Sequence, residues 1–182
     1  RNLKRLTQKL EGSCQSVMLF ELPLIESQWT QKSVFKYFDN YSEDLLLSNQ
    51  IMAGFIVLKK NRESIDFVES WLSLCCNENI LLEQTDKQSV VYKGHREDQS
   101  ILSVFAKIRG IKPFSDPSDH GRFPEMYLKS DRLFRLESKE KEFTINKSYF
   151  LLVRKTNVLI YFVKYFTKSI LGVFSLSIKL KA

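Results

Sequence analysis

Two apolar runs limit the folds open to this chain. Residues 16–22 and 50–58 have the length and composition of buried strands, and the second run contains the small pair Ala53-Gly54. Amphipathic segments with helical spacing lie between and after these runs. Alternation of strands with helices favours an α/β layer fold, in which helices cover a sheet. The chain has 182 residues, of which 43% are hydrophobic, and this is enough for one domain with its own core.

Capping residues, glycines and prolines predict where the helices and strands begin and end. The expected elements are a helix over residues 2–11 that stops at Gly12, a strand over 16–22 that stops at Pro23, a helix over 30–38 capped by Thr30, a central strand over 50–58, a helix over 62–76 capped by Asn61, a loop over 80–94, a helix over 95–109 that stops at Gly110, and a last strand from Ile111 to Phe114. The helix after Asn61 is expected to bury a face made of Ile65, Val68, Leu72, Cys75 and Cys76.

The excess of positive charge lies at the C-terminal end of the sequence. The chain carries 28 basic and 21 acidic residues, a net charge of +7. Residues 149–182 hold six basic residues and no acidic one, so residues 1–148 are close to neutral, with 22 basic and 21 acidic residues. We therefore expect a folded body over residues 1–125 and a basic, aromatic tail over residues 126–182. A nearly neutral body argues against a nucleic-acid partner, because such proteins gather basic residues on a folded face.

The tail has the pattern of an amphipathic helix. Its apolar residues would share one face, and Lys164 and Lys168 would lie on the opposite one. The apolar face is made of Leu159, Phe162, Val163, Phe166, Ile170, Val173 and Phe174. One interpretation is an interfacial helix on an anionic membrane, and the other is a helix packed on the body with a basic outer face. A membrane-spanning helix is not expected, because two lysines interrupt the apolar run.

The densest group of polar residues is the string His-Arg-Glu-Asp-Gln-Ser at residues 95–100, which opens an expected helix. Asp98 precedes apolar positions of the buried stripe by three and four residues, so its side chain is expected on the side of the core. Arg96 and the helix N-terminus would offer positive potential to a phosphate or another anion. The alternative is that an acid in this turn only stabilises the start of the helix.

Two further segments carry candidate ligand-binding residues. The second apolar run begins with Gln50 and contains Ala53 and Gly54, whose small side chains would let a ligand or another strand approach. A packing glycine without any ligand is an equally good interpretation. Trp29 lies in a polar loop before Lys32, and its indole ring would suit stacking on a sugar or a hydrophobic contact at a helix entry.

In this order, the segments resemble a protein family. The pattern is Trp29-Thr30, Gln50-x-x-Ala53-Gly54, Asn61, Trp71, His95-Arg96-x-Asp98-Gln99-Ser100 and Asp116-Pro117-Ser118. It is similar to bacterial glycosyltransferases of the GT-A type, which are nucleotide-diphospho-sugar transferases found in capsule and lipopolysaccharide biosynthesis. The resemblance covers about residues 1–122, and the string at residues 95–100 is its most specific motif.

The resemblance implies the C-terminal portion of a GT-A-like α/β fold and transfer of a sugar from a nucleotide-sugar donor to a glycan or lipid-linked acceptor. The Asp98-Gln99 pair is similar to a catalytic Asp-Gln pair near the donor sugar, and Ala53-Gly54 is similar to a strand that borders that sugar. The expected substrate-binding residues are His95, Arg96, Ala53, Gly54, Gln50, Trp29 and Lys32. A carboxylate or amide suits this chemistry because positive charge develops at the anomeric carbon, and cations neutralise the leaving diphosphate.

The resemblance also implies Mg²⁺ or Mn²⁺, held in the intact family by an Asp-x-Asp motif that follows an early strand. The chain contains no such motif and no complete metal site is expected in it; in the family, the motif and the nucleotide-binding strands would precede Arg1. Two functions therefore stay open. One is a glycosyltransferase acting on a surface polysaccharide or lipooligosaccharide, and the other is a non-catalytic remnant or membrane-associated interaction domain of the same fold. The expected location is the cytoplasm, peripheral at the inner membrane face, and three cysteines without a disulfide pattern fit a reducing compartment.

Overall fold

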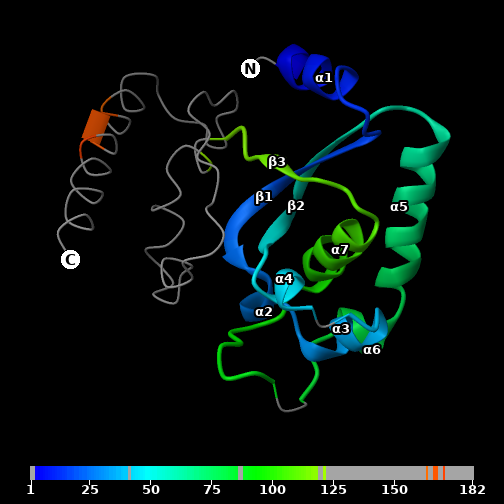
Figure 1. The fold of residues 1–182 in the computed structure, drawn as a ribbon, viewed down its shortest axis with the longest axis vertical. Helices are drawn as coiled ribbons and strands as arrows, with labels where there is room; N and C mark the ends of the chain where they lie inside the picture. The colour runs from blue at the N-terminus through cyan, green and yellow to red at the C-terminus, as the bar shows by residue number, and fades with distance from the viewer. Residues whose placement is uncertain are drawn as a thin grey trace.

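The computed structural model describes residues 3–40, 42–85, 88–118 and 121, together with Val163, Phe166, Thr167 and Ile170. Helices and strands follow one another in a mixed α/β arrangement, as the sequence predicts (Figure 1). Their order is α1 (Leu3–Glu11), β1 (Val17–Ile25), α2 (Glu26–Trp29), α3 (Lys32–Tyr37), α4 (Glu43–Leu46), β2 (Asn49–Leu58), α5 (Arg62–Cys75), α6 (Glu78–Leu81), α7 (Glu97–Ile108) and β3 (Phe114–Ser115).

The three strands form one small sheet in the order β2-β1-β3. Strand β1 pairs antiparallel with β2 and parallel with β3, and it is buried along nearly its whole length. The prediction of a central strand over residues 50–58 is therefore wrong in position, because β1 lies in the middle and β2 lies at an edge of the described sheet. Helix α7 packs beside β2, and α5 lies on the far side of α7 (Figure 1).

Strand β1 runs through Pro23 instead of ending there. Its neighbours Glu21 and Ile25 pair with Ile51 and Asn49, and the register shifts between these two pairs. A proline has no backbone N–H to donate, so a strand tolerates it where the ladder is already interrupted. The expected strand end is thus a local irregularity of a longer strand.

Strand β2 bulges away from β1 at its small residues. Met18 pairs with Val57 and Phe20 pairs with Met52, so the single residue Leu19 stands opposite residues 53–56. Bulges of this kind bend a strand and re-aim its side chains, and they are frequent next to functional sites. Ala53 and Gly54 lie in this bulge.

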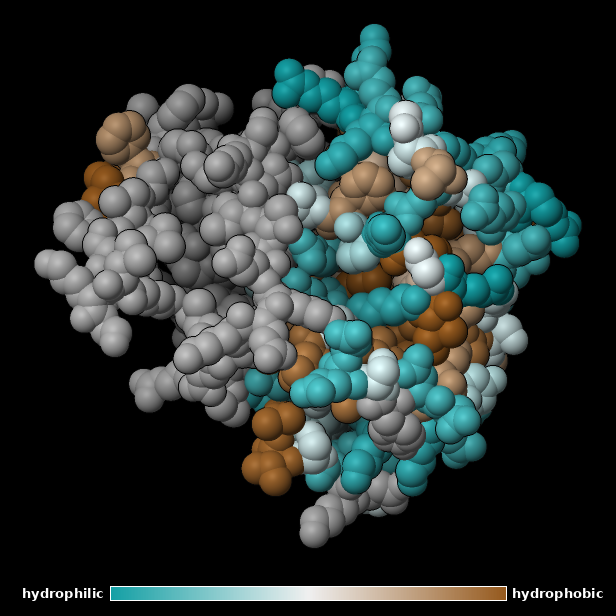
Figure 2. All heavy atoms as spheres, viewed as in Figure 1, coloured by the Kyte–Doolittle hydropathy of each residue, from teal (hydrophilic) through white to brown (hydrophobic). Residues whose placement is uncertain are grey.

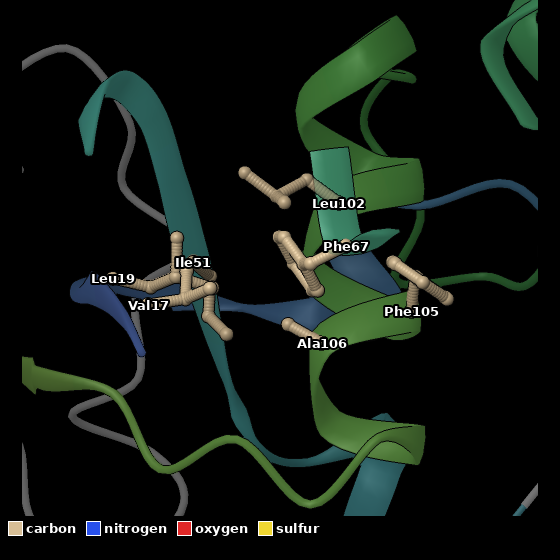
Figure 3. Close-up of a cluster of buried hydrophobic side chains, with 7 residues drawn as sticks. All are labelled: Val17, Leu19, Ile51, Phe67, Leu102, Phe105 and Ala106. Atoms are coloured by element: carbon tan, nitrogen blue, oxygen red, sulfur yellow. The ribbon is translucent and has the colours of Figure 1, made fainter. Parts of the chain in front are cut away.

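The main core lies between the sheet and the two long helices (Figure 3). Its buried members are Val17, Leu19, Ile51, Phe67, Leu102, Phe105 and Ala106. The rings of Phe67 and Phe105 stack with their centroids 5.1 Å apart, which joins α5 to α7. Figure 2 shows apolar side chains that remain visible in the middle of the described face, over the region where Figure 1 places α5 and α7.

The buried face of α5 differs from the prediction. Phe67 is buried, and Val68, Trp71 and Leu74 pack against the same core. Three members of the expected face are exposed instead: Ile65 is 44% exposed, Leu72 is 64% exposed, and Cys76 is exposed as well. The helix carries two overlapping apolar stripes, and burial favours the stripe with the larger aromatic surfaces.

Capping explains two of the helix boundaries and corrects a third. Asn61 caps α5 as predicted, in a reciprocal capping box with Ser64, and Gly110 follows α7 with a positive φ of 72°. Thr30 does not cap α3, which begins at Lys32 after Gln31. The Thr30 hydroxyl instead donates a hydrogen bond to the Glu26 carboxylate at 2.5 Å.

The predicted boundary near residue 125 and most of the tail over residues 126–182 lie outside the described residues. The four described tail residues are helical, and Val163, Phe166 and Ile170 are exposed. Within the described part of the chain, no helix has both the length and the apolar character needed to cross a membrane.

Candidate functional site

A buried network of polar side chains joins three segments that are far apart in the sequence. Its centre is Gln50 on β2, whose side chain is 0% exposed. The Gln50 Oε1 accepts a hydrogen bond from Gln99 Nε2 on α7 at 2.9 Å. The Gln50 Nε2 donates to Ser100 Oγ at 3.3 Å and to the Trp29 carbonyl at 3.4 Å. Ser100 Oγ also donates to the Trp29 carbonyl at 2.7 Å. These hydrogen bonds join three segments, which are the C-terminal end of α2, strand β2 and helix α7.

A buried ion pair continues this network below Gln50. The Glu26 carboxylate on α2 is 0% exposed and pairs with Lys107 on α7. It also accepts hydrogen bonds from Thr30 and Ser103, and Ser103 Oγ accepts from the backbone N–H of Ile51 at 2.8 Å. A buried carboxylate needs such a set of donors and a cation to offset its lost hydration.

Gln99 extends the network to the bulge of β2. Its Oε1 accepts from the backbone N–H of Ala53 at 3.4 Å, while its Nε2 donates to Gln50. Gln99 from the string at residues 95–100 therefore meets Gln50 and Ala53 of the second apolar run at one point. This is the juxtaposition on which the predicted site depends.

Gly54 follows directly in the bulge and is exposed. A Cβ placed there would meet only side-chain atoms of Met52, at 3.7 and 3.8 Å, which is ordinary van der Waals contact. The packing of the described residues therefore does not require a glycine at this position. Gly121 is the opposite case, because a Cβ there would lie 2.1 Å from the carbonyl oxygen of Asp116. The packing interpretation of Gly54 thus has no support among its described neighbours.

Asp98 does not turn into the core as expected. Its side chain is exposed in the first turn of α7, and its carbonyl accepts a hydrogen bond from Trp71 Nε1 at 3.1 Å. An exposed acid at this place is favoured by the helix dipole, which is the alternative left open by the sequence. Glu97, the residue before it, has a φ of 39°, in the left-handed region that non-glycine residues seldom adopt.

The charge of Asp98 also affects the pKa of a thiol on α5. Burial raises the pKa of the Cys75 thiol to about 11, and Asp98 and Cys76 add to this rise. A thiol with such a pKa is protonated at neutral pH and is a poor nucleophile. Cys75 is therefore not a candidate for covalent chemistry.

Two cations lie over the indole ring of Trp29. The Arg96 guanidinium is 4.6 Å and the Lys93 ammonium is 5.8 Å from the ring centroid. Such contacts are favourable because the face of the ring carries negative potential. They place positive charge beside the network formed by Gln50 and Gln99. The indole takes part in cation–π contacts, in addition to the hydrophobic packing of Trp29 against Leu22, Leu24 and Met52.

The structure keeps two predicted site residues apart from this network. His95 is buried and its Nε2 contacts the carbonyl of Ile80 at 2.9 Å, so it fastens the loop before α7 to α6. Burial lowers the pKa of His95, which favours a neutral ring. Lys32 is exposed on α3, and its backbone N–H donates to Gln88 Oε1 at 2.9 Å.

Sequence reasoning missed the roles of Glu26, Ser103 and Lys107. A signal for part of this set exists, since Ser100, Ser103 and Lys107 follow one another at intervals of three and four residues in the part of α7 after Gln99, which is otherwise apolar. A polar stripe of this kind on a buried helix predicts a buried hydrogen-bond or ion-pair partner for its side chains. Its partner Glu26 lies 81 positions away from Lys107, and only the fold brings the two together.

The described residues contain no group of three or more His, Cys, Asp or Glu side chains arranged to hold a metal ion.

The chain matches no protein-family model, no curated protein and no solved structure.

Proposed function

We propose that this chain is a glycosyltransferase of the GT-A type, which moves a sugar from a nucleotide-sugar donor to a surface polysaccharide or lipooligosaccharide. The observation that carries the proposal is the meeting of Gln99, Gln50 and the bulge at Ala53-Gly54. Gly54 is exposed there, and its neighbours leave space for a side chain. Glycine in a strand is frequent at bulges and where a ligand approaches the backbone closely, and the second role is the one that supports the proposal.

The chemistry of the neighbouring groups supports the same role. Asp98 is an exposed carboxylate one residue before Gln99, at the start of α7. We assign to it the stabilisation of positive charge that develops on the donor sugar, and to Gln99 the orientation of sugar hydroxyls. Arg96 lies over Trp29 beside this region, where a cation would favour the diphosphate of the donor.

The expected Mg²⁺ or Mn²⁺ has no place among the described residues, because they form no cluster of metal-ligating side chains. We therefore assign no step of the proposed reaction to a metal held by the described residues. The described residues would contribute to sugar recognition and to charge stabilisation at the anomeric carbon.

The test is a sugar-transfer assay on the protein as its gene encodes it. Labelled UDP-glucose, UDP-galactose and GDP-mannose serve as donors, and glycan extracted from the source organism serves as the acceptor. We expect Asp98→Asn and Gly54→Val to lower transfer by about tenfold or more, with an unchanged melting temperature. Gly12→Ala is the matched control, since Gly12 is exposed and the nearest atom to an added Cβ there is 3.5 Å away. Full turnover by Asp98→Asn would overturn the assignment of that residue.

A second candidate is a membrane-associated interaction domain or non-catalytic remnant of the same fold. It is favoured by the exposed apolar side chains of Val163, Phe166 and Ile170, which are spaced as on one helix face. Sedimentation with phosphatidylglycerol vesicles tests it, with phosphatidylcholine vesicles as the control and Phe166→Glu as the variant expected to lose binding. The genomic sequence upstream of the codon for Arg1 separates the two candidates. An in-frame strand followed by an Asp-x-Asp motif favours the enzyme, and a stop codon favours the remnant.

A further inference from the structure

A pocket of 340 Å³ lies between α2, α3, α4 and the loop that contains residues 88–91. It shares Thr30 with the polar network, because Thr30 lines the pocket and its hydroxyl bonds to Glu26 and Gln50. The pocket is thus adjacent to the proposed transfer site but has walls of its own. Its volume lies at the lower end of the range typical of small-molecule sites, about 300–1,000 Å³.

The pocket combines apolar walls with a polar rim. Phe35, Leu46 and Val91 supply apolar surface from α3, α4 and the loop. Lys32 and Glu43, which line the pocket as well, are both exposed and carry opposite charges. The Glu43 carboxylate would repel an anionic ligand. A lipid chain could not form hydrogen bonds or ion pairs with the two charged side chains.

A neutral sugar fits this combination. The C–H face of a pyranose ring packs on apolar and aromatic side chains, while its hydroxyl groups both donate and accept hydrogen bonds. Glu43 would accept from a hydroxyl, and Lys32 and Ser89 would donate to one. We propose that this pocket binds a terminal neutral sugar of the glycan acceptor; the proposal rests on the glycosyltransferase function given above.

The experiment measures binding in solution. The ¹⁵N-labelled chain is titrated with the methyl glycosides of glucose, galactose and N-acetylglucosamine, and amide shifts are followed by NMR. At least one glycoside is expected to shift signals of residues 88–91 and of α3. Val91→Trp fills the pocket from its loop, where Val91 is 47% exposed, and is expected to weaken binding by about tenfold or more. Glu43→Gln removes the charged acceptor and is expected to weaken binding by about fivefold to tenfold.

Val90→Trp is the matched control, because Val90 is fully exposed and does not line the pocket. It is expected to bind the glycoside like the wild type. Binding of sodium octanoate in place of every glycoside would overturn the proposal, and so would glycoside shifts that Val91→Trp leaves unchanged.

The two experiments distinguish a failure of the pocket proposal from a failure of the proposed function. A wild-type protein that binds a glycoside in the pocket but transfers no sugar refutes the proposed function and keeps the pocket. A protein that transfers sugar at the wild-type rate with Val91→Trp, and whose pocket binds no glycoside, refutes the pocket and keeps the function.

Discussion

The buried pair of Glu26 and Lys107 allows a quantitative test of the polar network. We consider Lys107→Met, which keeps the aliphatic stem of the side chain and removes its charge. The Glu26 carboxylate is 0% exposed and would keep only the hydroxyl donors of Thr30 and Ser103 among the contacts described above. Removing one partner of a buried pair costs about 3–5 kcal/mol. The hydroxyls remain and the Lys107 side chain is 14% exposed, so we expect the lower end, about 3 kcal/mol.

The assays are urea unfolding, which gives the free energy of unfolding, and thermal unfolding, both followed by the fluorescence of Trp29 and Trp71 and by far-UV circular dichroism. A loss of about 3 kcal/mol would lower the melting temperature of a chain of this size by about 6–12 °C. The double variant Glu26→Gln/Lys107→Met is the control, because it removes both charges and leaves a neutral amide whose one oxygen still accepts from a hydroxyl. It should be less destabilised than the sum of the single variants by about 1–3 kcal/mol. A cost below about 1 kcal/mol for Lys107→Met, or strict additivity in the cycle, would refute the description of this pair as buried and coupled.

Three further predictions concern single residues. Burial lowers the pKa of His95 in the folded protein, so the unfolded state binds a proton at this ring more readily. The contribution of the neutral ring to folding stability is therefore complete above the ordinary pKa of 6.5 and declines as the pH falls below that value. His95→Gln should therefore show a weaker loss of stability between pH 6.5 and pH 5 than the wild type, measured by urea unfolding at each pH. The Cys75 thiol, with a pKa of about 11, should react with iodoacetamide at pH 9 about 50-fold more slowly than a thiol with the ordinary pKa of 9.0, as judged by mass spectrometry of the alkylated peptides. Asn61→Ala should cost about 1 kcal/mol because it removes the side-chain cap of α5, whereas Asn61→Ser should retain most of that stability in the same unfolding assay.

The elements that the sequence predicted well are those whose signals are local. The capping box at Asn61 and the stop at Gly110 depend only on residues within one turn of the helix, and both are confirmed. The strand over residues 50–58 also appears, as β2. The short-range chemistry of caps and the length of an apolar run are independent of the rest of the fold.

The predictions that were wrong depend on contacts with segments that are distant in the sequence. Pro23 is accommodated within β1 because the ladder to β2 is already out of register at that point. Ile65 and Leu72 are exposed because Phe67 meets Phe105 on α7, and this choice between two stripes of α5 depends on the packing partner. Asp98 is exposed, although its spacing from buried residues placed it on the side of the core.

The order of residues by itself determined which side chains are present in the candidate site and in which local elements they lie. The local pattern predicts a strand that contains Gln50 and a helix that begins near Gln99, and the structure has both. Only the tertiary structure decided that these two amides bond to each other across 49 positions, and that Glu26 finds its cation at Lys107. The physical reason is that caps and periodicity act over a few residues, whereas buried polar groups must find partners wherever the folded chain brings them.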